Sequence, residues 1–86
     1  MNINELIAIV KSKLETKIVI QDIKIEDKSF LHKKHKGHQE GKFHLKLTIK
    51  SNELTKLSKI DSTKRVYSII DFELKEYIHS IQILLS

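Results

Sequence analysis

The chain has 86 residues, of which 40% are hydrophobic, and it contains neither cysteine nor proline. This length allows one domain with a single thin core, and the missing cysteines exclude disulfides, thiolate metal sites and thiol nucleophiles. The formal net charge is +5, yet Arg65 is the only arginine among 16 basic residues, so the guanidinium forks that usually recognise phosphates and bases are scarce. No apolar run approaches the ~20 residues that cross a membrane, and no basic-then-apolar signal opens the chain, which predicts a cytoplasmic protein.

The first two predicted elements are a helix and a strand. Apolar residues recur at helical spacing over residues 3–14, and Asn2 or Asn4 can cap the start of this helix. Isoleucine recurs at positions 18, 20, 23 and 25, and this recurrence of a β-branched residue predicts a strand over residues 18–27. The alternation slips by one position at residues 21–22, so we expect a bulge there.

A long loop and the clearest strand follow. Residues 28–41 hold four lysines, three histidines and both glycines. Nothing in this segment can bury an apolar face, so it predicts a mobile loop rich in histidine and lysine. Residues 42–50 alternate strictly between apolar and polar side chains. One face of this strand is therefore expected in the core, and the other, which includes His44, is expected to face water.

The last third of the chain predicts a helix and a strand after an irregular stretch. Residues 51–60 lack a clear period, with a short turn that points Leu54 and Leu57 inward. A helix then covers residues 61–77, capped by its first or second residue. Glu73 falls on the apolar face of this helix, and we expect its carboxylate to reach outward to solvent.

The order of these elements is α-β-β-α-β. Residues 42–50, 61–77 and 79–85 make a strand–helix–strand unit, which requires a parallel, right-handed crossover. The sequence therefore predicts an α+β fold: a three-stranded mixed sheet with helices packed on one face. No internal repeat or boundary interrupts residues 1–86, so we expect a single domain.

The five histidines are the chemically most informative residues, because imidazole is a ligand for transition metals. His32, His35 and His38 recur every three residues in the loop, a spacing found in metal-binding tracts and equally in solvated polar loops. His44 is expected to have a structural hydrogen-bonding role. His79 opens the last strand and fits either a strand-edge histidine or a ligand. The chain lacks a nucleophile with a paired base and orienting group, so we do not expect an enzyme.

Three segments, taken together and in order, resemble the BolA family. They carry an acidic-x-Ser turn with a loop histidine, a His-apolar-x-apolar strand that ends in serine, and an apolar-His-x-apolar-x-apolar strand. In this sequence they read Asp27-Lys-Ser-Phe-Leu-His32, Phe43-His-Leu-Lys-Leu-Thr-Ile-Lys-Ser51 and Tyr77-Ile-His-Ser-Ile-Gln-Ile83. The family's fold is similar to the type II K-homology fold, which agrees with the element order predicted here.

The chain departs from the family pattern at two places. Ser62-Thr-Lys64 stands where members usually carry Arg-His-Arg, and Leu54-Thr-Lys56 stands where they usually carry Phe-x-Gly. Lys64 and Arg65 retain part of the positive charge that this segment presents to a partner.

The resemblance implies a partner of monothiol glutaredoxins that takes part in iron–sulfur trafficking or iron-linked regulation. The pair holds a bridging [2Fe–2S] cluster, to which the matching ligands on this chain are His79 and His32, with His35 as an alternative loop ligand. A partner cysteine and glutathione supply the sulfur, because this chain has none to offer as thiolate. The isolated chain is then expected to be a monomer without a cofactor.

The alternative is a transcriptional regulator that binds nucleic acid weakly. Residues 51–61 contain no Gly-x-x-Gly loop to clamp nucleotides, and the strand face expected to be wet has no aromatic platform. Basic side chains nevertheless provide a surface for phosphates or for an acidic partner, at Lys33, Lys34, Lys36, Lys56, Lys59, Lys64 and Arg65.

Overall fold

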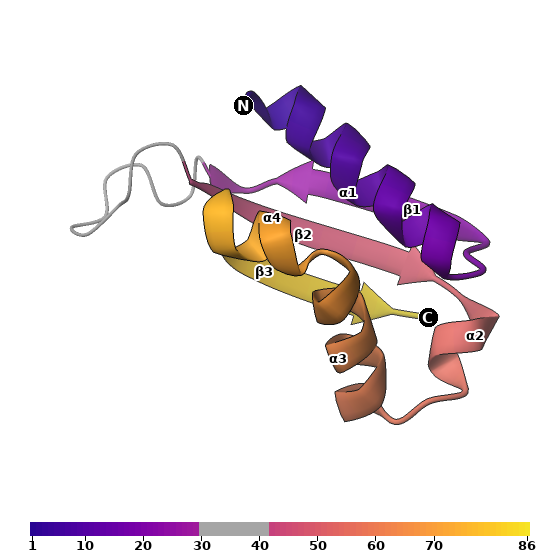
Figure 1. The fold of residues 1–86 in the computed structure, drawn as a ribbon. Helices are drawn as coiled ribbons and strands as arrows, with labels where there is room; N and C mark the ends of the chain where they lie inside the picture. Colours follow the sequence, from indigo (N-terminus) through magenta and orange to yellow (C-terminus); the bar gives the residue numbers. More distant parts are fainter. Residues whose placement is uncertain (30–41) are drawn as a thin grey trace.

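The computed structural model describes residues 1–29 and 42–86, which form a three-stranded sheet and four helices (Figure 1). Strand β2 is central, paired antiparallel with β1 and parallel with β3. The α+β class, the element order and the mixed sheet are therefore as the sequence predicts. In chain order the elements are α1 (Ile3–Lys17), β1 (Asp22–Asp27), β2 (Phe43–Lys50), α2 (Asn52–Thr55), α3 (Lys59–Ile69), α4 (Asp71–Glu76) and β3 (Ile78–Leu85).

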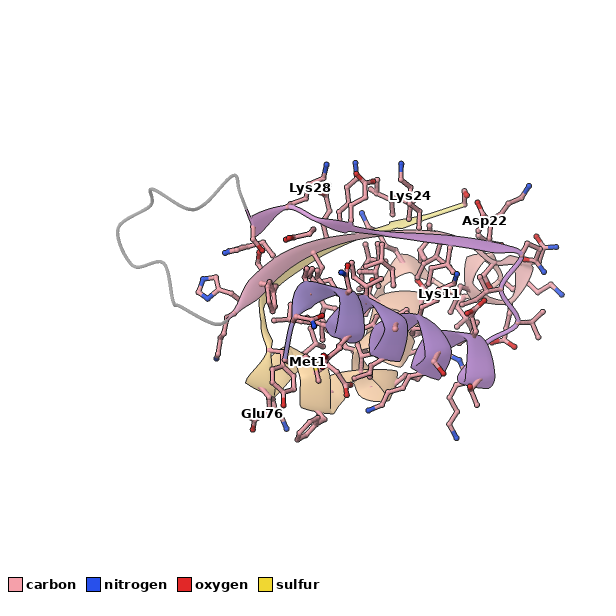
Figure 2. The ribbon with its side chains drawn as sticks, turned by 90° about the horizontal axis from the view of Figure 1, so that it is seen from above. Met1, Lys11, Asp22, Lys24, Lys28 and Glu76 are labelled. Atoms are coloured by element: carbon pink, nitrogen blue, oxygen red, sulfur yellow. The ribbon has the colours of Figure 1, made fainter. Side chains whose placement is uncertain are left out.

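The helices cover one face of the sheet and leave the other open, as expected (Figure 2). The core lies between α1, the inner face of the sheet and the helices that precede β3. Burying one aliphatic side chain of this kind stabilises a fold by about 1.5–3 kcal/mol. No helix in the described ranges is long and apolar enough to cross a membrane. The buried apolar residues are Leu6, Val10, Leu14, Ile18, Leu45, Leu47, Ile49, Leu54, Val66, Ile70 and Ile78.

Helix α1 begins where the sequence predicts and ends later. The Asn2 side chain accepts a hydrogen bond from the backbone N–H of Glu5 at 2.8 Å, so Asn2 and not Asn4 is the cap. The helix continues to Lys17, three residues beyond the prediction, through exposed residues that carry no apolar signal.

The expected strand at residues 18–27 starts only at Asp22. Ile18 is buried and ends α1, because its N–H donates to the carbonyl of Leu14. The pairing of β1 with β2 is continuous from Asp22 opposite Lys50 to Asp27 opposite Leu45. The N–H of Gln21 also donates to the carbonyl of Lys50 at 2.8 Å, so residues 21 and 22 both face Lys50, which is the pattern of the bulge predicted there. The isoleucines at positions 18 and 20 resemble part of a strand in the sequence, but they lie in the connection between α1 and β1.

The single helix predicted for residues 61–77 is two helices. Ser58 caps α3 three or four residues earlier than expected, with its hydroxyl accepting from the N–H of Asp61 at 3.1 Å. The chain then bends at Ile70, whose φ of −108° and ψ of 26° are not helical. Leu54 is buried as predicted, whereas Leu57 is 41% exposed because α2 has already ended at Thr55.

Glu73 corrects a further expectation, since its side chain does not reach solvent. It is 3% exposed, and its Oε2 accepts a hydrogen bond from Lys13 Nζ at 2.7 Å. Lys13 lies on α1, 60 residues earlier in the chain. A charged residue on an apolar helix face is accommodated here by a partner on another helix, a long-range contact that periodicity does not reveal.

Candidate functional site

Two histidines meet where the parallel strands β2 and β3 begin. The register shifts there: Phe43 is opposite Ile78, and His44 is opposite Ser80, so His79 lies at the irregularity between these pairs. The ring centroids of His44 and His79 are 4.9 Å apart, with the ring planes tilted by 60°. His79 is exposed, while His44 is only 6% exposed. The face of β2 that was predicted to be wet therefore has one buried residue, His44.

His44 is held by two serines. Its backbone N–H donates to Ser29 Oγ at 3.0 Å, and its ring Nδ1 lies 2.6 Å from Ser80 Oγ. These contacts confirm the structural hydrogen-bonding role expected for this residue. A serine hydroxyl so close to Nδ1 fixes the orientation of the imidazole.

The acidic-x-Ser motif has a direct structural explanation. The N–H of Ser29 donates to Asp27 Oδ1 at 2.9 Å, and the N–H of Lys28 donates to the carbonyl of His44 at 2.7 Å. The Asp27 side chain thus bends the chain just after β1, as aspartate does in tight turns. The turn places the Ser29 hydroxyl beside the start of β2, where it accepts the hydrogen bond from His44 N–H. Sequence reasoning did not identify Ser29 or Ser80 as supports, although an aspartate two residues before a serine is a recognisable turn signal.

The described part of the site offers few side chains that could ligate a metal ion. In residues 1–29 and 42–86, no three side chains of His, Asp or Glu gather closely enough to hold a metal ion. The predicted loop ligands His32 and His35 lie outside the described residues. The chain contributes imidazole nitrogen but, with no cysteine, no thiolate sulfur.

The predicted basic surface is divided. Lys56, Lys59 and Lys64 are exposed around α2 and α3, whereas the predicted Lys33, Lys34 and Lys36 lie outside the described part of the chain. Arg65 is engaged within the protein: its Nη2 donates to the carbonyl of Lys17 at 3.0 Å and lies 3.5 Å from Glu53 Oε2. Its guanidinium therefore ties α3 to the end of α1 and to α2.

Comparison with known proteins gives the family of the chain. The model of the family described as "BolA-like protein" matches residues 14–86. The BolA domain of SufE1 from Arabidopsis thaliana superimposes with a TM-score of 0.77 at 25% identity, covering 92% of this chain and 87% of that one. BolA1 from Arabidopsis thaliana gives 0.76 at 22% identity with the same coverage.

The solution structure of BolA1 from Mus musculus has a TM-score of 0.74 at 18% identity, covering 92% of this chain and 62% of that one. No curated protein matches the sequence significantly. The family model covers most of the chain, and the structural neighbours share its element order and mixed sheet. The chain therefore belongs to the BolA-like protein family.

Proposed function

We propose that this protein pairs with a monothiol glutaredoxin and shares a bridging [2Fe–2S] cluster with it, in iron–sulfur trafficking or iron-linked regulation. His79 is the ligand borne by the strand, and His32 or His35 is the ligand borne by the loop. Membership of the BolA-like family supports the class of function. The finer assignment depends on the site around His79.

The single observation that carries the proposal is where the histidine-rich segment is attached. Ser29, the last described residue before that segment, bonds to His44, whose ring touches His79. His32 follows Ser29 by three residues in the sequence, and an extended chain spans at most about 3.6 Å per residue. This short separation in sequence is compatible with the proposed pairing of His32 with His79.

The chemistry of the available donors fits a shared cluster and not a private one. Two imidazoles on one iron are a known ligand set for a [2Fe–2S] cluster, and they raise its reduction potential relative to four thiolates. The second iron requires sulfur, which this chain lacks entirely. A glutaredoxin cysteine and glutathione provide it, so the cysteine-free composition favours obligate pairing.

Coexpression with a monothiol glutaredoxin tests the proposal. We expect a brown heterodimer whose bound iron falls and whose visible spectrum changes in His79→Ala. Comparing His32→Ala with His35→Ala identifies the loop ligand, and His38→Ala is the matched control from the same loop. A colourless mixture, with no complex detected by NMR titration, would reject the pairing.

A second candidate, weak binding of nucleic acid, is favoured by the exposure of Lys56, Lys59 and Lys64. Because such contacts release counterions, the association constant should fall steeply as salt is added. An electrophoretic or fluorescence assay that finds no binding at low salt, or binding that is insensitive to salt, removes this candidate.

A further inference from the structure

The open face of the sheet carries three lysines around one carboxylate. Ile23 and Ile25 of β1 lie opposite Ile49 and Leu47 of β2, and both β2 residues are buried under the helices. The intervening residues therefore point to the open side. Figure 2 shows Lys24 and Lys28 on the side of the sheet away from α1.

The strand register places the central lysine of this cluster. Lys46 on β2 is opposite Glu26 on β1 and opposite Gln82 on β3. Glu26 bonds to Lys28 Nζ at 2.9 Å through Oε2, and its Oε1 lies 3.8 Å from Lys24 Nζ. Three ammonium groups therefore surround a single carboxylate, which leaves an excess of positive charge on this face.

The pKa of Glu26 is affected by the same excess of positive charge. The hydrogen bond from Lys28 is the largest cause that lowers the pKa of Glu26 from its ordinary value of 4.5, and the charges of Lys24, Lys28 and Lys46 lower it further. Ammonium groups that stabilise the Glu26 carboxylate in this way are suited to stabilise a second, external anion.

Next to the cluster lies a hollow of about 350 Å³ with a mixed polar and apolar lining. The backbones of Lys46 and Gln82 pair within the sheet, but in the described ranges their side chains make no hydrogen bond or ion pair, and Lys46 acts on Glu26 through its charge alone. Both side chains are therefore available to an external acceptor. The lining comprises Lys28, His44, Leu45, Lys46, Ser80, Ile81 and Gln82.

We propose that this hollow binds a phosphate group, with Lys28 and Lys46 as the cationic donors and the Gln82 amide as the neutral donor. An ammonium donates three hydrogen bonds without a planar fork, which suits a tetrahedral oxyanion better than a flat carboxylate. The aromatic ring in this lining is the buried imidazole of His44, which Ser80 already holds, so we expect the phosphate, not a stacked base, to be the recognised part of the ligand. It is carried by a small phosphomonoester or by a nucleic-acid backbone. The site requires neither iron nor a glutaredoxin.

The test is an NMR titration of the whole chain, labelled with ¹⁵N, at low ionic strength. The probes are inorganic phosphate, ribose 5-phosphate and a short single-stranded DNA. We expect saturable shifts at the amides around Lys46 and Gln82, with dissociation constants on the order of 1–10 mM for the small phosphates if they are the source. Lys46→Gln should weaken binding about tenfold, the scale of one charged hydrogen bond.

Two further variants make the test specific. Glu26→Gln should tighten binding several-fold, because it removes the competing carboxylate and releases Lys28; a misfolded variant would not gain affinity. Lys11→Gln is the matched control, since it removes the same charge from an exposed position on α1. Figure 2 shows Lys11 away from the open face.

The outcomes are decisive. Binding of ribose 5-phosphate and inorganic phosphate supports a small-molecule ligand, and binding of the oligonucleotide alone supports a nucleic-acid backbone. The proposal is overturned if no probe gives saturable shifts, if Lys46→Gln and Lys11→Gln weaken binding equally, or if Glu26→Gln fails to tighten it.

Discussion

The ion pair between Lys13 and Glu73 makes a sharp prediction about stability, because its two members lie in different environments. The Glu73 side chain is 4% exposed and that of Lys13 is 42% exposed, with Nζ and Oε2 2.7 Å apart. The other carboxylate oxygen of Glu73, Oε1, is buried without a hydrogen-bond partner in the described structure. Removing the lysine therefore leaves a buried charge, whereas removing the glutamate leaves a lysine that already reaches water.

Lys13→Met should destabilise the protein by about 3 kcal/mol. Breaking a buried pair costs roughly 3–5 kcal/mol, and we take the lower end because water reaches the lysine side of this pair. The substitution also removes a weak contact in which Lys13 Nζ lies 5.9 Å from the centre of the Phe72 ring. For a domain of this size the loss corresponds to a fall in Tm of about 12–24 °C.

Glu73→Leu should change the stability by less than about 1 kcal/mol, since apolar replacement of a buried charge is often neutral or stabilising. The double variant Lys13→Met/Glu73→Leu should then resemble Glu73→Leu. Urea unfolding at pH 7, followed by circular dichroism, measures all four proteins. Equal losses in the two single variants, or a double variant as unstable as Lys13→Met, would refute this reasoning.

Three further predictions concern the helix cap, the buried histidine and the open face. Asn2→Ala should cost about 1 kcal/mol in urea unfolding, whereas Asn4→Ala, at a position that does not cap, should cost much less. Ser80→Ala should cost about 1–3 kcal/mol, because the buried His44 ring loses a hydrogen-bond partner, and the ¹⁵N chemical shifts of that ring should change; unchanged shifts would contradict the contact. Glu26 has a depressed pKa in the folded protein, so its contribution to stability is present above its ordinary pKa near 4.5 and is lost as pH falls through the lower, folded value. Glu26→Gln should therefore be less stable than the wild type at pH 7, with the difference shrinking as the pH falls below the folded pKa of Glu26, and a difference that persists unchanged in acid would contradict this assignment.

Local patterns predicted most of the architecture. The strict alternation over residues 42–50 identified a strand, and the structure shows that this strand is central and pairs with both others. Apolar spacing over residues 3–14 identified the helix that packs on it. These signals are strong because each element buries one face of regular period, so the same residues carry both the secondary structure and the core.

The predictions failed where a residue's role depends on something distant in sequence. Ile18 continues an isoleucine alternation, yet it is buried as the cap of α1. Glu73 is buried because Lys13 lies against it, a pairing between helices that no local pattern encodes.

Part of the candidate site was predicted from motifs, and part of it was not. His79 was found because it opens an apolar strand. The contact between His79 and His44 depends on a register shift between β2 and β3, which alternation alone does not reveal. The open-face lysines were also missed as a cluster, because Lys24, Lys28 and Lys46 come together only through the pairing of β1 with β2.

The ligands of the shared cluster provide the most direct test of the proposed function. This chain is labelled with ¹⁵N-histidine, combined with an unlabelled monothiol glutaredoxin, glutathione, iron and sulfide, and studied by pulsed EPR after reduction. We predict ¹⁵N hyperfine coupling from directly bound imidazole, with the His79 contribution lost in His79→Ala. A reduced [2Fe–2S] complex without ¹⁵N coupling, or with unchanged coupling in His79→Ala, would contradict the account.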